Sequence, residues 1–488
     1  MSDARTAPNV QIETKKDLPK NVEVAYYVFN FLNSFSTVMS LGYLTFFVTE
    51  WTGVSATLMA TVYTVARFAD LGVQVFAGNI MQRLNKFRPL LLIVPLISQG
   101  GNLISFLNPN IPIGVKLIVL TVGYCMIHFP MNFWTITTFT LLMRIAGPNP
   151  ENRMAITASN TRAFSAQRII QPLITLPLIL WFIERGLPGY LLVMIIYGIV
   201  TFIACGYLYV VTKPYETPEI IERWKAAQAS NVKPPSFLEM YKLAAKNRPI
   251  VALLISSTIN TGIGGQVFAA GTMYYWRYSV GSFALQPVGG SIAGFVALGV
   301  ALFAPFLAKK MGKKNTWLFN MGLNIIVYLI VMFFADGNPW VFISVVAIQT
   351  LGTNLVGVWG IQLWLDAAEV QLYETGIDIR SFTMGLNNYP IKLGFIVSGP
   401  FVAIMLNNSG YVESAAGVGT LDDPARFVMI WMIIPLIGMV VSFINLFINY
   451  NISEDYAKQC AVANVAAAAE RQAAAAAAGG GAAPAAAR

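Results

Sequence analysis

Residues 187–212 read LPGYLLVMIIYGIVTFIACGYLYVVT, an apolar stretch without a single Asp, Glu, Lys or Arg. About 20 such residues are enough for a helix to span the hydrocarbon core of a bilayer. A surface helix of a soluble protein would instead need one polar face. The stretch therefore predicts a transmembrane helix whose backbone amides are hydrogen-bonded within the segment itself.

The same pattern recurs along the chain, which has 488 residues, 56% of them hydrophobic and 11% charged. Soluble proteins carry roughly 25% charged residues, so this composition does not fit a water-soluble fold. We expect twelve transmembrane helices in an all-α membrane protein, embedded in a lipid bilayer. Their predicted ranges are 24–49, 55–80, 89–108, 112–143, 155–183, 187–212, 249–275, 287–308, 316–335, 339–365, 383–406 and 427–450.

The basic residues of the loops predict the orientation of these helices. Lys and Arg accumulate in the cytoplasmic loops of membrane proteins. One set of loops holds only four of the 32 basic residues, namely Lys116, Arg185, Arg277 and Arg426. That set is predicted to be external. We therefore expect a multi-pass protein of the plasma membrane, the inner membrane of the cell, with both termini in the cytoplasm.

A polar stretch at 213–248 carries seven basic residues and divides the helices into two sets of six. The second inner loop of each half carries a similar basic cluster, Arg83-Leu84-Asn85-Lys86 and Lys310-Met311-Gly312-Lys313. Two six-helix halves in a parallel repeat are typical of the major facilitator fold. The predicted parts are a cytoplasmic segment 1–23, a half 24–212, a cytoplasmic loop 213–248, a half 249–450 and an Ala-rich cytoplasmic tail 451–488. We expect this tail to be helical only near Ala466 and otherwise disordered.

The remaining composition argues against several other classes of protein. The net charge of +9 lies in short loops between apolar segments, which does not favour binding of nucleic acid. Cys125, Cys205 and Cys460 share no short spacing, so we expect neither a disulfide framework nor a metal site. One histidine and the lack of a sizeable polar domain argue against an enzyme or a sensor. We expect no cofactor, and a monomer.

Ionisable residues inside the predicted helices are candidates for function, because each costs roughly 3 kcal/mol at the bilayer centre. Asp70 is the only acid near the middle of any predicted span. Arg67 and Gln74 lie three residues before it and four after it, so the three share one helix face. Asp70 is a candidate for binding a coupling proton or cation. The alternative is a structural ion pair with Arg67 or Lys392.

Other polar residues in the spans are candidates for binding a substrate. His128, the only histidine, suits proton exchange or sugar hydroxyls, and the alternative is a packing role. Arg162 and Arg168 present guanidinium donors that suit hydroxyls or a carboxylate, although Arg168 would also suit a structural ion pair. Lys392 shares a helix face with Asn388. Aromatic residues that would either stack on a sugar or merely pack are Trp134, Tyr124 and Trp364.

Several of these residues resemble motifs of the glycoside–pentoside–hexuronide:cation symporters, the branch of the major facilitator fold that includes the melibiose permease. The similarity covers most of residues 24–450 and rests on motifs in the same order on the same helices. They are Val65-Ala66-Arg67-Phe68-Ala69-Asp70, Gly78, Arg83-Leu84-Asn85-Lys86-Phe87-Arg88-Pro89, Asn149-Pro150-Glu151-Asn152-Arg153 followed by Arg162, Tyr274-Tyr275-Trp276-Arg277-Tyr278 with Gly281, the set Asp366, Tyr373, Gly376 and Arg380, and Lys392.

The resemblance implies uptake of a sugar by alternating access, driven by Na⁺, Li⁺ or H⁺. It implies that Asp70 and Lys392 form the cation site, to which we add Gln74, and that the substrate is bound by Arg162 and by the position that His128 holds. We add Trp134, Arg168 and Asn388 to the candidate substrate site. The residues that we expect at a conformational or inner gate are Arg67, Arg83, Arg153, Asp366 and Arg380.

This chain also departs from the family pattern. The Asp-x-x-Asn-Asp motif reads Asp70-Leu71-Gly72-Val73-Gln74, so that only one carboxylate remains. Sodium prefers several hard oxygen ligands, whereas one carboxylate suffices for a proton. We therefore expect coupling to H⁺, with Na⁺ as the alternative. Two sugar-binding acids of the family are also absent and Arg168 is an additional arginine, which favours an anionic substrate such as a uronide. The alternative function is an uncoupled facilitator, or a carrier of another small amphipathic solute.

Overall fold

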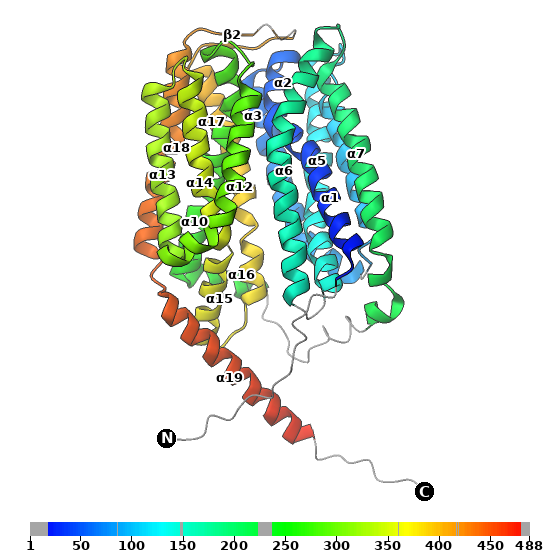
Figure 1. Ribbon diagram of the computed structural model, residues 1–488, viewed down its shortest axis with the longest axis vertical. Coiled ribbons are helices and arrows are strands. Elements are labelled where there is room, and N and C mark those ends of the chain that lie inside the picture. The colour runs from blue at the N-terminus through cyan, green and yellow to red at the C-terminus, as the bar shows by residue number, and fades with distance from the viewer. Residues whose placement is uncertain are drawn as a thin grey trace.

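The computed structural model describes residues 18–84, 86–146, 150–222, 237–359, 361–415, 417 and 419–479. Two helical bundles stand side by side in it, one from each half of the chain (Figure 1). The elements of the first half are α1 (Lys20–Val38), η1 (Met39–Tyr43), α2 (Leu44–Trp51), α3 (Ala56–Leu84), α4 (Leu90–Ser105), α5 (Ile113–Ala146), α6 (Pro150–Ile183), α7 (Gly189–Val211) and η2 (Lys213–Tyr215).

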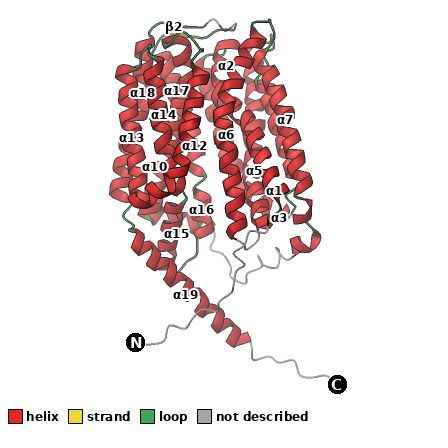
Figure 2. Ribbon diagram, viewed as in Figure 1, coloured by secondary structure: helices red, strands yellow, loops and turns green. Residues whose placement is uncertain are grey.

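The second half follows the same plan with more breaks in its helices. Its elements are α9 (Phe237–Lys246), α10 (Arg248–Thr258), η3 (Ile259–Val267), α11 (Phe268–Tyr274), η4 (Tyr275–Ser279), α12 (Gln286–Met311), α13 (Lys313–Phe334), α14 (Pro339–Trp359), α15 (Gln362–Thr375), α16 (Arg380–Leu386), α17 (Tyr389–Asn407), β1 (Tyr411–Val412), β2 (Thr420–Leu421), α18 (Pro424–Asn449) and α19 (Glu454–Gly479). Figure 2 shows how completely helices dominate.

All twelve predicted ranges coincide with helices, and residues 187–212 correspond to α7. Among the described residues, nine helices are long and apolar enough to cross a membrane. α4 and residues 286–300 of α12 form shorter apolar helices, and α3, which carries Arg67 and Asp70, belongs to neither group. The all-α membrane architecture is therefore confirmed. The sequence did not predict the short antiparallel pair of β1 and β2, in which Tyr411 faces Leu421.

The two ends of the helical bundles are different, and we name them by what they carry. One end carries α9, α15 and α19 and is called the tail side (Figure 1). The opposite end carries β1 and β2 and is called the hairpin side. The long helices of the two bundles run from one side to the other, whereas α19 extends away from the bundles on the tail side (Figure 1). A residue near the middle of a bundle helix therefore lies between the two sides.

In each half, the loop before the third long helix is held by an acid that follows the last helix of that half. Glu216 accepts hydrogen bonds from the backbone N–H groups of Phe87, at 2.6 Å, and Arg88, at 3.0 Å. In the second half, Glu454 accepts one from the backbone N–H of Lys313 at 2.7 Å. Both acids bind at the N-terminal end of the third helix of their half, where the helix dipole favours negative charge. The two halves therefore share a basic cluster in this loop and also an acid, Glu216 or Glu454, that binds the backbone at its end.

Glu216→Gln is expected to destabilise the first half by about 3 kcal/mol, because Glu216 is also the anionic partner of Arg144. The Arg144 Nη1 and Glu216 Oε1 atoms lie 2.9 Å apart, and both side chains are almost completely buried. The measurement is the thermal unfolding midpoint of the purified protein in detergent. Glu219→Gln, at an exposed position of the same segment, is the matched control. Equal midpoints for the two variants would contradict the prediction.

The tail is helical over a longer range than the sequence indicates. α19 is continuous from Glu454 to Gly479, whereas we expected helix only near Ala466. Its first turns pack on α15, where Asn464 donates to the Glu369 backbone oxygen at 2.9 Å and to its carboxylate at 2.7 Å. Ala457 and Cys460 are buried against Val370. Alanine has the highest helix propensity, and this contact with α15 anchors the start of the helix.

Candidate functional site

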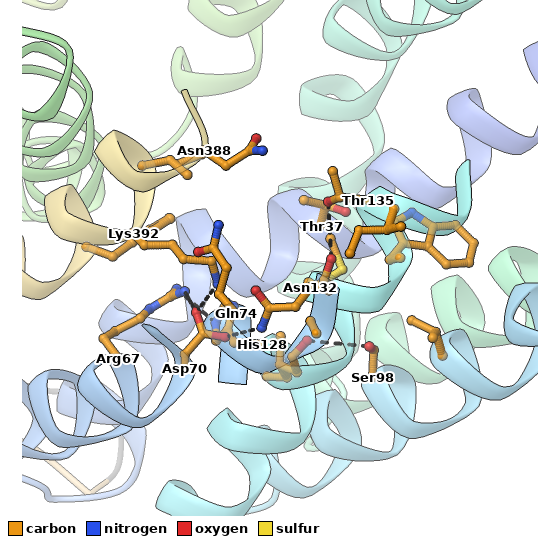
Figure 3. A pocket seen from close by; sticks show the side chains of 18 of the residues that line it. Thr37, Arg67, Asp70, Gln74, Ser98, His128, Asn132, Thr135, Asn388 and Lys392 are labelled. Carbon is orange, nitrogen blue, oxygen red and sulfur yellow. Dashed lines mark hydrogen bonds and ion pairs between the residues drawn. The ribbon is translucent and has the colours of Figure 1, made fainter. Parts of the chain in front are cut away.

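A cavity of about 840 Å³ lies between the two halves, within the 300–1,000 Å³ that is usual for small-molecule sites. α1, α3, α4 and α5 form its wall in the first half, and α16 and α17 form its wall in the second (Figure 3). Met240 of α9 also lines it, so the cavity extends toward the tail side. The residues singled out in the sequence that line it are Arg67, Asp70, Gln74, His128, Trp134, Asn388 and Lys392.

Asp70 lies at the centre of this site and is only 1% exposed. Its Oδ2 accepts a hydrogen bond from Lys392 Nζ at 2.5 Å, and its Oδ1 accepts one from Asn132 Nδ2 at 2.7 Å. Arg67 Nη1 lies 3.7 Å from Oδ2. Since Asp70 belongs to α3 and Lys392 to α17, this buried ion pair joins the two halves of the protein.

Asn132 was not singled out in the sequence. It lies four residues after His128 on α5, and residues at this spacing share a helix face. Figure 3 shows that it points toward Asp70, with which it shares a dashed bond. The spacing from His128 was the signal that would have identified it. A polar residue in a span is common by itself. A buried polar residue on the same face as a candidate site residue is itself a candidate for the site.

Arg67 and His128 form a second layer behind the ion pair. Arg67 Nε donates to the Tyr124 hydroxyl at 2.7 Å, and its Nη2 lies 3.0 Å from His128 Nε2. A guanidinium group only donates, so His128 Nε2 is the acceptor and the imidazole is neutral with its proton on Nδ1. The guanidinium also stacks on Phe395 at 3.9 Å. Arg67 therefore lies beside Asp70, with which it shares one face of α3, and its role at an inner gate stays a prediction.

The position of Lys392 depends on a close crossing of α17 and η3. A Cβ atom added to Gly262 would overlap the Cα atom of Gly394, so the two backbones are in contact. Gly394 follows Lys392 by two residues, and this crossing fixes the height of Lys392 in the bundle. α17 begins after a break at Asn388, whose side chain lines the same cavity. π-helical segments such as η3 occur frequently at functional sites.

Beyond the Asp70 cluster, the wall of the cavity in the first half is uncharged, and amides and hydroxyls lie among its apolar residues. Ser40 Oγ donates to Asn102 Oδ1 at 2.6 Å, and Ser36 and Thr201 share a hydrogen bond of 3.0 Å. Ser40 lies in η1, a π-helical turn that interrupts the first span. Amides and hydroxyls of this kind both donate and accept, which suits the hydroxyl groups of a sugar. These residues could not be identified from the sequence, because isolated Ser and Asn residues occur in most spans.

Arg162 and Arg168, which were predicted to bind substrate, do not line this cavity. Arg162 is exposed on α6. Arg168 lines a second cavity, of about 370 Å³, between α6, α12 and α14. Trp364 is completely buried in the second half and faces neither cavity. A substrate-binding role for the two arginines stays a prediction.

Two of the predicted gate residues form ion pairs within the second half, on the tail side. Asp366 is 2.6 Å from Lys313 Nζ, and Arg380 pairs with Glu369 at 3.0 Å and Asp378 at 2.8 Å. Burial raises the pKa of Asp366, and its bond with Lys313 opposes this change. Hydrogen bonds from Arg380 lower the pKa of Asp378. The side chains of Arg83 and Arg153 lie outside the part of the chain that the structure describes.

On the hairpin side the two halves are held together around Glu50, which is 1% exposed. Its Oε1 accepts hydrogen bonds from the hydroxyl of Tyr278 and, at 2.9 Å, from that of Tyr411. Its backbone oxygen accepts one from the N–H of Gly417 at 2.7 Å. We call Glu50, Tyr278 and Tyr411 the outer latch. Glu50 was missed because it falls one residue beyond the predicted span 24–49 and so resembled a loop acid.

The described ion pairs of the tail side, by contrast, each stay within one half. The Arg144–Glu216 pair belongs to the first half, and the Lys313–Asp366 pair belongs to the second. The halves are therefore joined at the hairpin side by the outer latch and in the middle by Asp70 and Lys392. This conformation is closed on the hairpin side, and its cavity extends toward the tail side.

A fold of two six-helix bundles, with a cavity between them that contains a buried ion pair, defines a transporter of the major facilitator type. The structure is similar to a mutant of the nucleoside transporter NupG, with a TM-score of 0.62, 14% identity and coverage of 88% of this chain and 100% of that one. It is also similar to a D-xylose–proton symporter, with a TM-score of 0.61, 13% identity and coverage of 87% and 97%.

The family model for MFS/sugar transport proteins matches residues 28–454, and the chain belongs to this family. The isoprimeverose transporter of Lactiplantibacillus pentosus is 24% identical over 447 residues, which cover 88% of this chain and 89% of the relative. The glucuronide carrier protein homolog of Escherichia coli (strain K12) is 25% identical over 410 residues, covering 80% and 84%. The resemblance to the glycoside–pentoside–hexuronide symporters is thereby confirmed, and the chain is a transporter and not an enzyme.

Proposed function

We propose that this protein imports a glycoside or another sugar by alternating access and couples the import to H⁺. The observation that carries the proposal is the buried pair of Asp70 and Lys392, which joins the two halves at the cavity. A pair in this position is made or broken according to the protonation of one carboxylate. Binding or release of one proton therefore changes the contact between the halves directly.

The surroundings of Asp70 favour a proton over Na⁺ as the coupling ion. The groups bound to its carboxylate are the ammonium of Lys392 and the amide nitrogen of Asn132, with the Arg67 guanidinium at 3.7 Å. These groups are donors, whereas a sodium ion needs several oxygen ligands. A proton needs only the carboxylate. When it binds Oδ2, the ammonium of Lys392 loses its partner and becomes available to the substrate.

The direction of import follows from the proposed orientation. The excess of Lys and Arg in the loops of the tail side supports a cytoplasmic location for that side. The described conformation is then open toward the cytoplasm and closed by the outer latch. In it, Asp70 is paired with Lys392, which corresponds to a carrier that has released its proton.

The cavity supports a sugar as the substrate. His128, Trp134 and Asn388 line it together with the amide and hydroxyl groups of the first half. The names of two relatives refer to isoprimeverose and to a glucuronide, which supports a glycoside as the substrate and includes an acidic one. Lys392 and Arg67 give the site two cations against the single carboxylate of Asp70, so an anionic glycoside is favoured.

The test is uptake into proteoliposomes across a panel of neutral and acidic glycosides, with an imposed pH gradient or an imposed Na⁺ gradient. We expect accumulation above the external concentration with the pH gradient alone. Accumulation with Na⁺ alone would contradict the coupling ion. Equilibration without accumulation under either gradient would favour the alternative of an uncoupled facilitator, in which Asp70 and Lys392 only join the helices.

A further inference from the structure

The second cavity, of about 370 Å³, lies where α6 of the first half meets α12 and α14 of the second half. α6 of the first half packs tightly on α12 of the second half beside it. A Cβ atom on Gly290 would come within 2.7 Å of Pro172, and one on Gly294 within 2.8 Å of Ile169. Ser291 Oγ donates to the Ile169 backbone oxygen at 2.8 Å. The cavity is therefore bounded by a rigid contact between the halves, and a ligand in it touches both.

Arg168 is the charged residue of this cavity, and it is an exposed residue of α6. Within the described chain it has no hydrogen bond or ion pair, and no acidic residue lines the cavity. Arg67, by contrast, is surrounded by Asp70, Tyr124 and His128. Cationic side chains inside transmembrane bundles normally pair with an acidic side chain or with backbone carbonyls. The planar guanidinium of Arg168 is thus available to a group from outside the chain. A carboxylate is complementary to it, because it accepts two parallel hydrogen bonds.

The neutral residues of the cavity offer complementary groups. Gln167 is 4% exposed, and the described part of the chain provides no hydrogen-bond partner for its amide. Gln349 Nε2 donates to Asn324 at 2.8 Å, which leaves its oxygen as an acceptor. The hydroxyls of Thr350 and Thr353 donate to carbonyls of their own helix, so their lone pairs are available. Acceptors of this kind suit the hydroxyls of a sugar ring.

We propose that this cavity is a subsite for an acidic sugar ring, with its carboxylate bound by Arg168 and its hydroxyls by Gln167, Gln349, Thr350 and Thr353. The inference rests on the proposed function and adds to it the place where an acidic substrate is distinguished from a neutral one. A volume of about 370 Å³ is at the small end of ligand sites, which suits a single ring. Because the subsite touches both halves, its occupancy depends on the state of the transport cycle.

The test compares methyl β-D-glucuronide with methyl β-D-glucoside, which differ only in the carboxylate. Binding to the purified full chain is measured by isothermal titration calorimetry, and uptake is measured in proteoliposomes. Arg168→Gln is expected to weaken glucuronide binding at least tenfold and to change glucoside binding by less than twofold. Arg168→Lys is expected to lie in between, because it keeps the charge and loses the bidentate geometry. Arg185→Gln removes an exposed arginine at the end of the same helix and is the matched control.

The binding measurements test the proposed subsite, and the uptake measurements test the proposed function. Glucuronide binding that is unchanged in Arg168→Gln, or reduced equally for both glycosides, overturns the subsite. A wild-type protein that binds the glucuronide no more tightly than the glucoside overturns it as well. If the wild type binds the glucuronide through Arg168 but transports no glycoside, the proposed function fails while the subsite stands.

Discussion

Asp70→Asn is expected to abolish accumulation of substrate against its gradient while downhill exchange continues. A proton that moves down a gradient of one pH unit supplies about 1.4 kcal/mol, which supports about tenfold accumulation of a substrate carried with it. An amide in place of the carboxylate cannot bind or release that proton. The accumulation ratio in proteoliposomes should therefore fall from about ten to about one per imposed pH unit.

The alternative is that the Asp70–Lys392 pair has only a structural role. It makes a different prediction, because Asp70 also stabilises Lys392 and Asn132. Removing one member of a buried ion pair costs about 3–5 kcal/mol, whereas replacing both members is often nearly neutral. The double variant Asp70→Asn with Lys392→Gln should therefore recover much of the thermal stability lost in Asp70→Asn. If the pair only joins helices and the coupling proton is bound elsewhere, the double variant also recovers accumulation. We expect stability to return without accumulation, and recovery of both would refute the coupling role of Asp70.

The sequence was most informative where the bilayer limits the choices. Lipid requires apolar residues on every exposed helix face, so the stretch 187–212 and its eleven counterparts could be located from composition. Charges in such stretches are costly and hence rare, which identified Asp70 and Lys392 before any contact was known. Their meeting at 2.5 Å joins residues that are 322 positions apart. The sequence offered this pair as one of two structural alternatives for Asp70.

What the sequence left open is how each helix is rotated about its axis. An apolar helix has a weak polar face, so its rotation depends on packing against its neighbours. Arg162 and Arg168 were assigned to one substrate site, yet neither lines the cavity that contains Asp70. The partners of Asn132 and Glu50 also became known only from the structure, because these partners lie on other helices. Close approaches such as that of Gly262 and Gly394 appear only when two helices are placed together.

Glu50→Ala is expected to open the hairpin side. The substitution removes the acceptor shared by Tyr278 and Tyr411, and both hydroxyls then lose their partner at a buried contact. Hydrogen bonds to a charged group contribute about 1.5–3 kcal/mol each, so the closed conformation loses about 3 kcal/mol or more. A change of that size shifts the balance between closed and open conformations about 100-fold. Glu50 belongs to α2, whereas its two partners belong to the second half, so the loss acts directly on the contact between the halves.

The opening is measured as a distance between spin labels on the hairpin side. Arg185 and Asp336 are exposed there, one on each half, and each is replaced by cysteine in a chain whose natural cysteines have been removed. Double electron–electron resonance should give a longer and broader distribution in Glu50→Ala. Glu413→Ala removes an exposed acid two residues from Tyr411 and should leave the distribution unchanged. Tyr278→Phe and Tyr411→Phe each remove one hydroxyl and should give intermediate shifts. If Glu50→Ala keeps the wild-type distribution, the closure of the hairpin side depends on the backbone contacts of Gly417 and its neighbours and not on the carboxylate.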